Sequence, residues 1–528
     1  MEMEKKQSTY STLFHWHSFK LKLVFEGICI GMVTGLVIVL YRLALEEAGY
    51  LLSYIYKLIL INPIIILPWI MLLIVIGYIV GLMVKHEPMI SGSGIPQVEG
   101  VLLRELDMTW WKVILGKFFG GVLSIGSGLS LGREGPSVQL GAAIGQGFSK
   151  VFKRIKIEEK YLITSGASAG LAAAFNAPLA GAMFALEEVH KNFSPLILLS
   201  ALSSALSADF IASSFFGLKP VFNFGAFATL PLNFYFYVIV LGVIVGFLGV
   251  LFNKVLLKTQ NLYIKQAWLK KEFRIIIPLL FSVALGLLLP EALGGGHELI
   301  TSLTEGKFSL ILLVIILVIK FSFTMASFGS GAPGGIFLPL LTIGALIGNV
   351  YGEVLMHIAH LDSIYINNFI ILAMAGYFAS VVKSPITGTI LITEMTGSFD
   401  HLLALAIVSI ISYIVADLLA SKPIYEALLE KFLQNQGDRT PIGDKINKAI
   451  LEFAVCIGSK LDGKQIKDVK WPSRCLLVAV RRGENEIIPK GDTVILPGDY
   501  LTVLTNEDRV PKINDTLLLM SESSDILK

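Results

Sequence analysis

The sequence Gly132-Arg133-Glu134-Gly135-Pro136 places an acidic side chain between glycines inside a long apolar part of the chain. Glycine lets other backbone segments approach closely, and proline is favoured in the first turn of a helix. We therefore predict a helix that begins here, within the membrane and not at its surface. The unpaired N–H groups of such a helix start carry about half a positive charge, which favours a bound anion.

Two further segments combine glycine and proline in the same way, Gly92-Ser93-Gly94-Ile95-Pro96 and the stretch 329–339. Three helix starts that point at one place would bind an anion through dipoles and hydroxyl groups, weakly enough to release it. A ring of buried arginines would hold the anion too tightly for transport. The alternative is close helix–helix packing through small residues. Because there are three such segments, two of them in repeat register, we favour the ion site.

The apolar part of the chain contains a weak internal repeat. Pro136 and Gly141 recur as Pro339 and Gly344, a shift of 203 residues in both cases. A second pair of segments also matches, because Pro178 precedes Glu187 by nine residues and Pro385 precedes Glu394 by nine. Two halves of about 200 residues in a membrane protein often pack as an inverted pair with the substrate between them.

The composition places most of the chain in lipid. Hydrophobic residues make up 54% of the 528 residues and charged residues 16%, against about 25% charged in soluble domains. Several apolar runs approach the roughly 20 residues that a membrane-spanning helix needs. The shorter runs favour discontinuous helices. The apolar runs are 23–45, 64–84, 234–251, 275–289, 310–319 and 402–419.

The distribution of basic residues predicts the orientation in the membrane. Two loops rich in lysine and arginine should face the cytoplasm, whereas the loop 217–232, with Lys219 alone, should lie outside. We expect the N-terminus and the C-terminus to be cytoplasmic and the protein to be a multi-pass protein of the cell membrane. No apolar signal-peptide core occurs in the first twenty residues. The basic loop residues are Lys150, Lys153, Arg154, Lys156, Lys265, Lys270, Lys271 and Arg274.

Hydrophobicity falls sharply after Leu433, where a polar linker is followed by a segment of soluble character. Alternating apolar residues predict strands at 475–482 and 500–505, and helical spacing occurs at 464–471. We therefore expect an all-α polytopic membrane protein with an inverted repeat and discontinuous helices, plus a small α+β cytoplasmic domain. The predicted divisions are an N-terminal segment 1–18, a membrane domain 19–433 with halves 19–230 and 231–433, a linker 434–446 and a C-terminal domain 447–528.

The three glycine-rich segments, GSGIP at 92–96, GREGP at 132–136 and GGIFLP at 334–339, resemble the signature segments of the CLC chloride channels and transporters. Their order and wide spacing agree with that family, and the resemblance covers about 19–433. It implies the CLC fold, a homodimer with one anion path per subunit, and chloride/proton antiport. A passive voltage- or ligand-gated chloride channel of the same fold is the alternative. The signatures of the fluoride-exporting branch are not apparent.

The resemblance also implies the anion contacts. The hydroxyl groups of Ser93 and Tyr425 would donate to a central chloride, together with the backbone amides of Ile336 and Phe337. The start of the Glu134 helix would face a more external site, which implicates Gly132, Arg133 and Gly135 as chloride-binding residues. Serine at position 93 is the family's pattern for chloride over nitrate.

Glu134 is the candidate external gate. A carboxylate in a membrane core is costly and therefore a functional candidate, and its charge lets it occupy an anion site at a helix start. Once protonated it loses that attraction and moves away, so one side chain competes with chloride and carries a proton. A neighbouring chloride should raise its proton affinity. The alternative is a static pair with Arg133, although adjacent helix residues do not face each other.

Glu188 matches the family's internal proton-transfer glutamate, which is present in exchangers and usually replaced in channels. Glu187 and Glu394 are repeat-related, and we interpret both as structural groups that cap or pair; for Glu187 a carboxylate at a helix end in water is the simpler alternative. Cys29, Cys456 and Cys475 have no metal-ligand spacing. We expect no metal, no cofactor besides the transported chloride and protons, and no enzymatic activity.

The C-terminal segment resembles the TrkA-C half of RCK potassium-channel regulators, on the stretches 487–494 and 496–499. Many CLC proteins carry paired CBS domains at this place instead. The resemblance implies a dimer and a possible small regulatory ligand, such as a cyclic di-AMP-like nucleotide; a dimer clamp without a ligand is the alternative. No nucleic-acid partner is expected. A ligand sensor whose membrane part has lost transport is the rival from another functional class.

Overall fold

The apolar runs of the sequence form helices that pack into one unit of the computed structural model, Met1–Lys431, and the C-terminal segment forms a second unit, Phe432–Lys528. Short 3-10 turns connect several of the helices. The described residues are 2–222, 224, 228–266, 269–306, 308–435, 448–483, 485–506 and 510–521.

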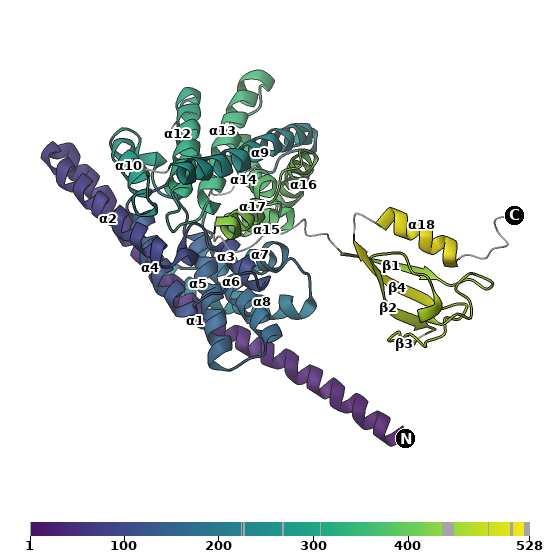
Figure 1. Cartoon of the computed structure of the whole chain (residues 1–528). Helices are drawn as coiled ribbons and strands as arrows, with labels where there is room; N and C mark the ends of the chain where they lie inside the picture. The colour runs from purple at the N-terminus through teal and green to yellow at the C-terminus, as the bar shows by residue number, and fades with distance from the viewer. Residues whose placement is uncertain are drawn as a thin grey trace. The chain divides into compact units, whose positions relative to one another are not determined.

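The first unit consists of helices α1 to α16 and the first residues of α17 (Figure 1). A π-helical turn, η3 (Ala185–His190), comes directly after α7. The helices are α1 (Glu2–Ile61), α2 (Ile66–His86), α3 (Ile95–Leu102), α4 (Trp110–Gly126), α5 (Glu134–Val151), α6 (Lys156–Phe175), α7 (Pro178–Phe184), α8 (Pro195–Phe216), α9 (Tyr235–Lys265), α10 (Ile276–Leu288), α11 (His297–Leu303), α12 (Leu310–Gly329), α13 (Phe337–Ala359), α14 (Ile366–Val382), α15 (Pro385–Thr396), α16 (Leu402–Leu418) and α17 (Ile424–Asn435).

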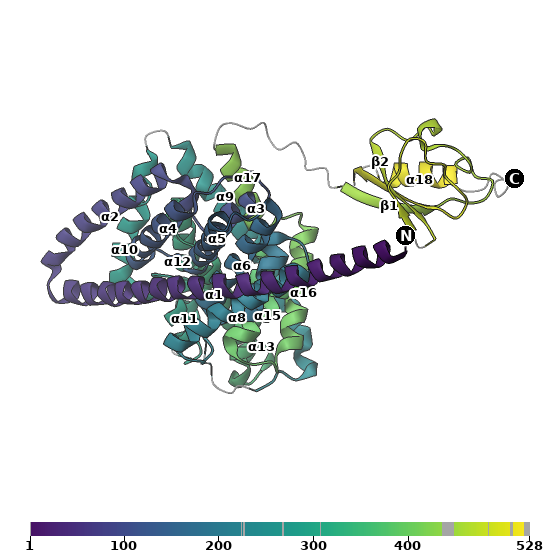
Figure 2. The ribbon, with the colours of Figure 1, turned by 90° about the horizontal axis from the view of Figure 1, so that it is seen from below.

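Seven helical segments within the described residues are long and apolar enough to cross a membrane. Several are longer than the apolar runs that predicted them: α1 begins at Glu2, inside the predicted N-terminal segment, and α9 continues to Lys265. The long helix α1 packs against α4, α5, α6 and α8 (Figure 2). The predicted linker 434–446 lies outside the described residues from 436 onward.

Each of the three glycine-rich segments leads into a helix, as the sequence predicted. These helices are α3, α5 and α13, and α3 has only eight residues, too few to cross a membrane. Gly94 precedes α3 with φ of 93°, a left-handed conformation that glycine adopts without strain. The fold is therefore a helical multi-span membrane architecture that includes helices of less than a full span.

The two repeats use glycine at the same place in their central helix pair. Gly141 of α5 faces Gly166 of α6 so closely that a Cβ atom on either would overlap the carbonyl group of the other. Gly344, 203 residues after Gly141, lies in the same way against α14, where an added Cβ atom would be 3.0 Å from the Ala373 carbonyl oxygen. Small residues at these crossings let the backbones of membrane helices pack tightly.

The second unit is an α+β domain with a four-stranded antiparallel sheet in the order β1-β4-β2-β3. Helix α18 (Val510–Ser521) packs on the sheet, and Phe453, Val480 and Leu501 belong to the buried core of this domain. The strands are β1 (Lys448–Ala454), β2 (Cys475–Arg482), β3 (Asn485–Ile487) and β4 (Tyr500–Asn506). The two predicted strands are thus confirmed within a residue.

The helix predicted at 464–471 is wrong, because only a 3-10 turn, Ile466–Asp468, forms there. The backbone amides of this segment bond elsewhere: Ile466 donates to Thr493 O at 3.0 Å and Lys467 to Gly491 O at 3.0 Å. These long-range bonds use the groups that a helix would have paired internally.

A buried carboxylate holds the end of the sheet together. Asp499 is fully buried and accepts two hydrogen bonds from Arg482, Nε to Oδ1 and Nη2 to Oδ2, both at 2.8 Å. The Leu496 amide donates a third bond to Oδ2 at 2.9 Å. Burial opposes ionisation of Asp499, but these hydrogen bonds outweigh it and hold the pKa of the carboxyl below its usual value.

Replacing this carboxylate should destabilise the C-terminal domain in a pH-dependent way. At neutral pH, Asp499→Asn should cost about 2–3 kcal/mol, because a charge-assisted bidentate pair is lost. A lowered folded-state pKa stabilises the native state above the unfolded carboxyl's pKa of about 4, and this contribution is lost as the pH falls further. Hydrogen exchange of β2 and β4, corrected for intrinsic rates, measures the difference.

The exposed Asp492→Asn is the matched control and should change stability by less than about 0.5 kcal/mol. Equal protection of parent and Asp499→Asn at neutral pH would contradict this account of Asp499. A difference that stays constant into acid would do the same.

Candidate anion site between three helix starts

Two of the glycine-rich segments are bonded to each other through their backbones. Gly132 donates to Gly335 O and Gly335 donates to Gly132 O, both at 2.7 Å, which forms an isolated antiparallel bridge. Helix α5 begins two residues after Gly132, and α13 begins two residues after Gly335. The bridge therefore brings the positive ends of two helices together inside the protein.

The third glycine-rich segment, 92–96, is also hydrogen-bonded to the segment that contains Gly335. Gly92 O accepts a hydrogen bond from Gly334 N at 2.9 Å. Ser93 lies directly against α5, since a Cβ atom on Gly135 would overlap the Ser93 hydroxyl oxygen. A Cβ atom on Gly335 would in turn be 3.0 Å from the Gly135 amide nitrogen. The structure thus brings together the three segments that the sequence singled out.

The two hydroxyl groups predicted to contact chloride are buried and have no bonding partner. The Ser93 side chain is 1% exposed and that of Tyr425 is 0% exposed. Neither Ser93 Oγ nor Tyr425 Oη has a hydrogen-bond partner among the described residues. Buried hydroxyl groups are normally satisfied, so these two are suited to a guest such as an anion. Ile336 and Phe337, at the start of α13, are buried as well.

Phenylalanine rings surround the start of α13. The Phe337 ring lies 5.3 Å from that of Phe175, 6.0 Å from Phe184 and 4.8 Å from Phe378, measured between centroids. An apolar wall strengthens the electrostatic effect of the helix start, because it keeps water away from the amides. Phe337 is therefore positioned to contribute both a backbone amide and part of this wall.

Glu134 lies at the meeting point of the two helix starts. Its side chain is fully buried, and neither carboxylate oxygen has a well-formed hydrogen bond within the part of the chain described. The carboxylate sits beside Gly132 and the Leu338 amide in the first turn of α13. Arg133 does not neutralise it in a static pair: the guanidinium lies 3.9 Å from Glu46 and donates to Ala174 O at 3.5 Å.

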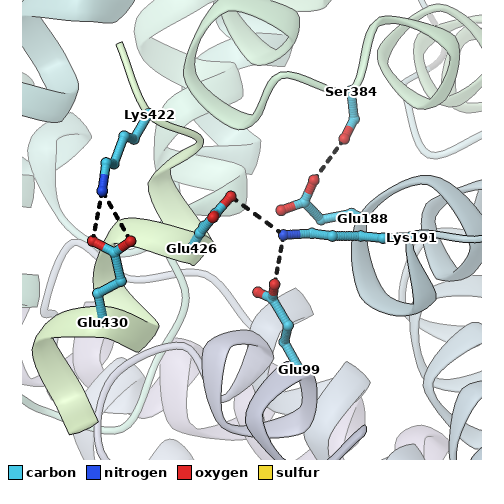
Figure 3. Close-up of polar contacts among 7 residues, drawn as sticks. All are labelled: Glu99, Glu188, Lys191, Ser384, Lys422, Glu426 and Glu430. Carbon is cyan, nitrogen blue, oxygen red and sulfur yellow. Dashed lines mark hydrogen bonds and ion pairs between the residues drawn. The ribbon is translucent and has the colours of Figure 1, made fainter. Parts of the chain in front are cut away.

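A second buried carboxylate, Glu188, lies in the π-helical turn η3, a conformation that often marks functional sites. Its Oε2 accepts a hydrogen bond from Ser384 Oγ at 2.8 Å, whereas Oε1 has no partner among the described residues (Figure 3). Tyr425 lies within electrostatic reach of both Glu134 and Glu188. Tyr425 therefore interacts electrostatically with both predicted proton carriers.

The repeat-related glutamates exchange partners between the two halves. Glu394 accepts from the amides of Leu179 and Ala180, at 3.1 and 2.7 Å, in the first turn of α7. Glu187 accepts from Ile386 N at 3.3 Å and from Thr387 N at 2.7 Å, in the first turn of α15. Each acid caps a helix of the other half, which agrees with the structural interpretation from the sequence and replaces the alternative of a solvated helix end for Glu187.

Two buried lysines support the site, and the sequence analysis missed both. Lys117 of α4 donates to Ile90 O at 2.9 Å and to Gly92 O at 2.6 Å. Lys320 of α12, 203 residues later, donates to three carbonyl groups of the loop that contains Gly294. The shared offset was the available signal, because it equals the shift that relates the two helix starts.

Tyr41 is another buried polar residue that the sequence did not reveal. It is fully buried in α1, its hydroxyl oxygen has no hydrogen-bond partner among the residues described, and it lies within electrostatic reach of Glu134. No sequence pattern distinguishes it, because it is one aromatic residue within a long apolar helix. Only packing brings α1 to this side of the site.

Lys117→Met should destabilise the membrane unit, because the carbonyl group of Ile90 loses its donor and that of Gly92 keeps only Gly334. We expect a loss of about 2 kcal/mol, seen as a lower midpoint of thermal aggregation in detergent. Lys112→Met, an exposed position on the same helix, is the control and should have little effect. Equal midpoints for the two variants would contradict the supporting role of Lys117.

Comparisons with known proteins agree with this geometry. Residues 76–417 match the family model described as voltage gated chloride channel, and residues 450–518 match the TrkA-C domain. The chain is 38% identical over 367 residues to the H+/Cl− exchange transporter ClcA of Vibrio campbellii, covering 68% of this chain and 78% of the relative.

Two solved structures are also similar. A slow cyanobacterial Cl−/H+ antiporter superposes with a TM-score of 0.74 at 29% identity, over 78% of this chain and 98% of the antiporter. A CLC-type fluoride/proton antiporter gives a TM-score of 0.63 at 27% identity, over 77% and 97% of the two chains. The fold, the converging helix starts and these matches establish that the chain is a multi-pass membrane protein of the CLC family, a family of transport proteins and not of enzymes, with a TrkA-C domain at its C-terminal end.

Proposed function

We propose that this protein exchanges chloride for protons across the membrane, as the names of its ClcA relatives and of the cyanobacterial antiporter say of those proteins. One observation carries the proposal: the buried, unpaired carboxylate of Glu134 lies where two helix starts meet. A carboxylate held at an anion site competes with chloride when ionised and leaves when protonated. The same side chain thereby links the two flows.

The anion contacts follow from this arrangement. The free hydroxyl groups of Ser93 and Tyr425 and the backbone amides of Ile336 and Phe337 bind the central chloride. A more external chloride lies at the start of α5, among Gly132, Arg133 and Gly135. Dipoles and hydroxyl groups bind chloride without a full opposing charge, which leaves it free to move on.

Glu188 provides the proton step on the other side. It is a second buried carboxylate with one unpaired oxygen, and Tyr425 lies within electrostatic reach of it and of Glu134. An acid at this position is present in the exchangers of the family and usually replaced in its channels, and burial of an ionisable group in a membrane protein is expensive. The presence of Glu188 therefore supports exchange over passive conduction.

The remaining assignments complete the proposal. The protein works as a homodimer with both termini in the cytoplasm. The basic loops with Lys150 and Lys270 face the cytoplasm, which orients Glu188 toward that side. Residues 1–18 form an N-terminal segment, 19–433 the transport domain and 434–446 the linker, and 447–528 regulate transport through a small ligand such as a cyclic di-AMP-like nucleotide.

Glu134→Gln should abolish proton coupling while chloride still moves. The amide cannot ionise, so it neither competes with chloride nor carries a proton. In proteoliposomes with an outward chloride gradient, we expect chloride efflux but at least a tenfold lower proton uptake. The exposed Glu291→Gln is the control and should behave like the parent. Retained proton uptake in Glu134→Gln would remove Glu134 from the mechanism.

Glu188→Gln should also separate the two flows. Chloride efflux should continue, because Glu188 is not among the anion contacts, whereas coupled proton uptake should fall at least tenfold. Glu187→Gln is the adjacent control: it weakens the cap on α15 but should keep the ratio of protons to chloride. The reversal potential under opposed chloride and pH gradients measures this ratio. An unchanged ratio in Glu188→Gln would exclude Glu188 as a proton carrier.

A further inference from the structure

Lys191 connects three elements at the Glu188 end of the transport domain. It follows η3 directly with φ of 53°, a left-handed conformation that ends the helical turn. Its ammonium group is 2.5 Å from Glu99 Oε1 of α3 and 3.6 Å from Glu426 Oε2 of α17. In Figure 3 these carboxylates and that of Glu188 surround the lysine side chain.

Charged groups of both signs interact with Glu188. The positive charge comes from the ammonium group of Lys191, and the negative charges come from the carboxylates of Glu99 and Glu187. Tyr425 also interacts electrostatically with Glu188. An opposite charge nearby favours the ionised form of a carboxyl group, and a like charge disfavours it. The balance between ionised and protonated Glu188 therefore depends on the positive charge of Lys191 and on the opposing negative charges of Glu99 and Glu187.

A small cavity reaches this group of charges. Its volume is about 80 Å³, and Glu99, Lys160, His190 and Lys191 are among the residues that line it. A cavity of this size and polarity has room for several waters, since one water needs about 10–15 Å³. His190 is fixed by a 2.9 Å hydrogen bond between Nδ1 and Thr164 Oγ1. The Glu99–Lys191 pair thus lines a cavity that can hold water, next to the turn η3 that carries Glu188.

We propose that Lys191, held between Glu99 and Glu426, is a positioning residue that sets the pH at which Glu188 takes up and releases its proton. This rests on the proposed exchange function. In the uptake step a hydrated proton forms an O–H bond on Glu188 and water is left, so Lys191 no longer interacts with a carboxylate charge on Glu188. In the reverse step that bond breaks, and the ammonium group stabilises the carboxylate that is left.

The arrangement also ties the proton step to the anion site. Glu426 follows Tyr425 directly at the start of α17, so the helix that presents the chloride-binding hydroxyl is the one that contacts Lys191. Glu426 is partly exposed, whereas Glu99 is buried. Removing Glu426 therefore leaves Lys191 anchored on Glu99, and the lysine can then act more fully on Glu188.

Lys191→Met tests the proposal in the full-length protein, reconstituted in proteoliposomes. Chloride-driven proton uptake is measured at a series of symmetric pH values from about 5 to 8, with chloride efflux recorded in parallel. Without the ammonium group Glu188 keeps its proton to higher pH, so the profile should move to higher pH by about one unit. Lys191→Arg should restore the parent profile, and Glu426→Gln should move it to lower pH.

Lys422→Met is the matched control, because Lys422 also pairs with a glutamate of α17, Glu430, at 2.9 Å. It should leave the profile in place. In a Glu188→Gln background, Lys191→Met should leave chloride efflux within twofold of the single variant, since the lysine acts through Glu188. The chloride efflux recorded in parallel for Lys191→Met itself shows that this variant is folded.

An unchanged profile in Lys191→Met, or the same shift in Lys422→Met, would overturn the role of Lys191 while leaving the exchange function intact. Failure of the proposed function looks different, because the parent itself would then show chloride efflux without coupled proton uptake at any pH. A Glu426→Gln profile that moves to higher pH would contradict the electrostatic argument even if Lys191→Met shifted as expected.

Discussion

The backbone bridge between Gly132 and Gly335 is the contact on which the site depends. Two hydrogen bonds of 2.7 Å hold the starts of α5 and α13 against each other, one from each repeat. Helix starts inside a protein leave N–H groups unpaired, which is costly unless a ligand or side chain meets them. Here the carboxylate of Glu134 lies beside them, so a negatively charged side chain occupies the place where the two buried helix starts meet.

The internal repeat supplies the side chains that support the site in two related pairs. Lys117 and Lys320 each fasten a glycine loop through its carbonyl groups, and Glu187 and Glu394 each cap a helix of the opposite half. These polar groups are satisfied by the backbone, which keeps them fixed. Ser93, Tyr425, Glu134 and one oxygen of Glu188 are, like Tyr41, among the buried groups that have no hydrogen-bond partner in the part of the chain that the structure describes.

The two sides of the transport domain differ in their electrostatics. At Glu134 the starts of α5 and α13, which are fixed in the backbone, act together with the charges of Arg133 and Arg42. Near Glu188 the compensating charge comes from Lys191, a flexible side chain shared with two other carboxylates. The helix starts belong to the backbone, whereas the shared lysine contacts two other elements, so the surroundings of Glu188 depend on both of them. Helix α17 takes part at both sites, through Tyr425 and Glu426.

By itself the sequence predicted the class of fold, the three helix starts and the candidate Glu134, because glycine, proline and buried charge in apolar sequence have few physical explanations. The sequence offered Ser93, Glu188 and Tyr425 as candidates only through its resemblance to the CLC family. It also predicted two strands of the C-terminal domain from their alternation. The prediction was wrong at 464–471. The local spacing there resembles that of a helix, but the backbone amides form hydrogen bonds to Gly491 and Thr493 in place of helical ones.

Only the tertiary structure could show which polar atoms remain without partners, since that depends on contacts between segments that are not neighbours in the sequence. The roles of Lys117, Tyr41 and Lys191 are of this kind. Each is an ordinary residue in its local sequence, and each acquires its role because packing brings distant carbonyl groups, a carboxylate or a cavity beside it. Local pattern fixes where helices begin, but the partner of a buried polar group is decided by the fold.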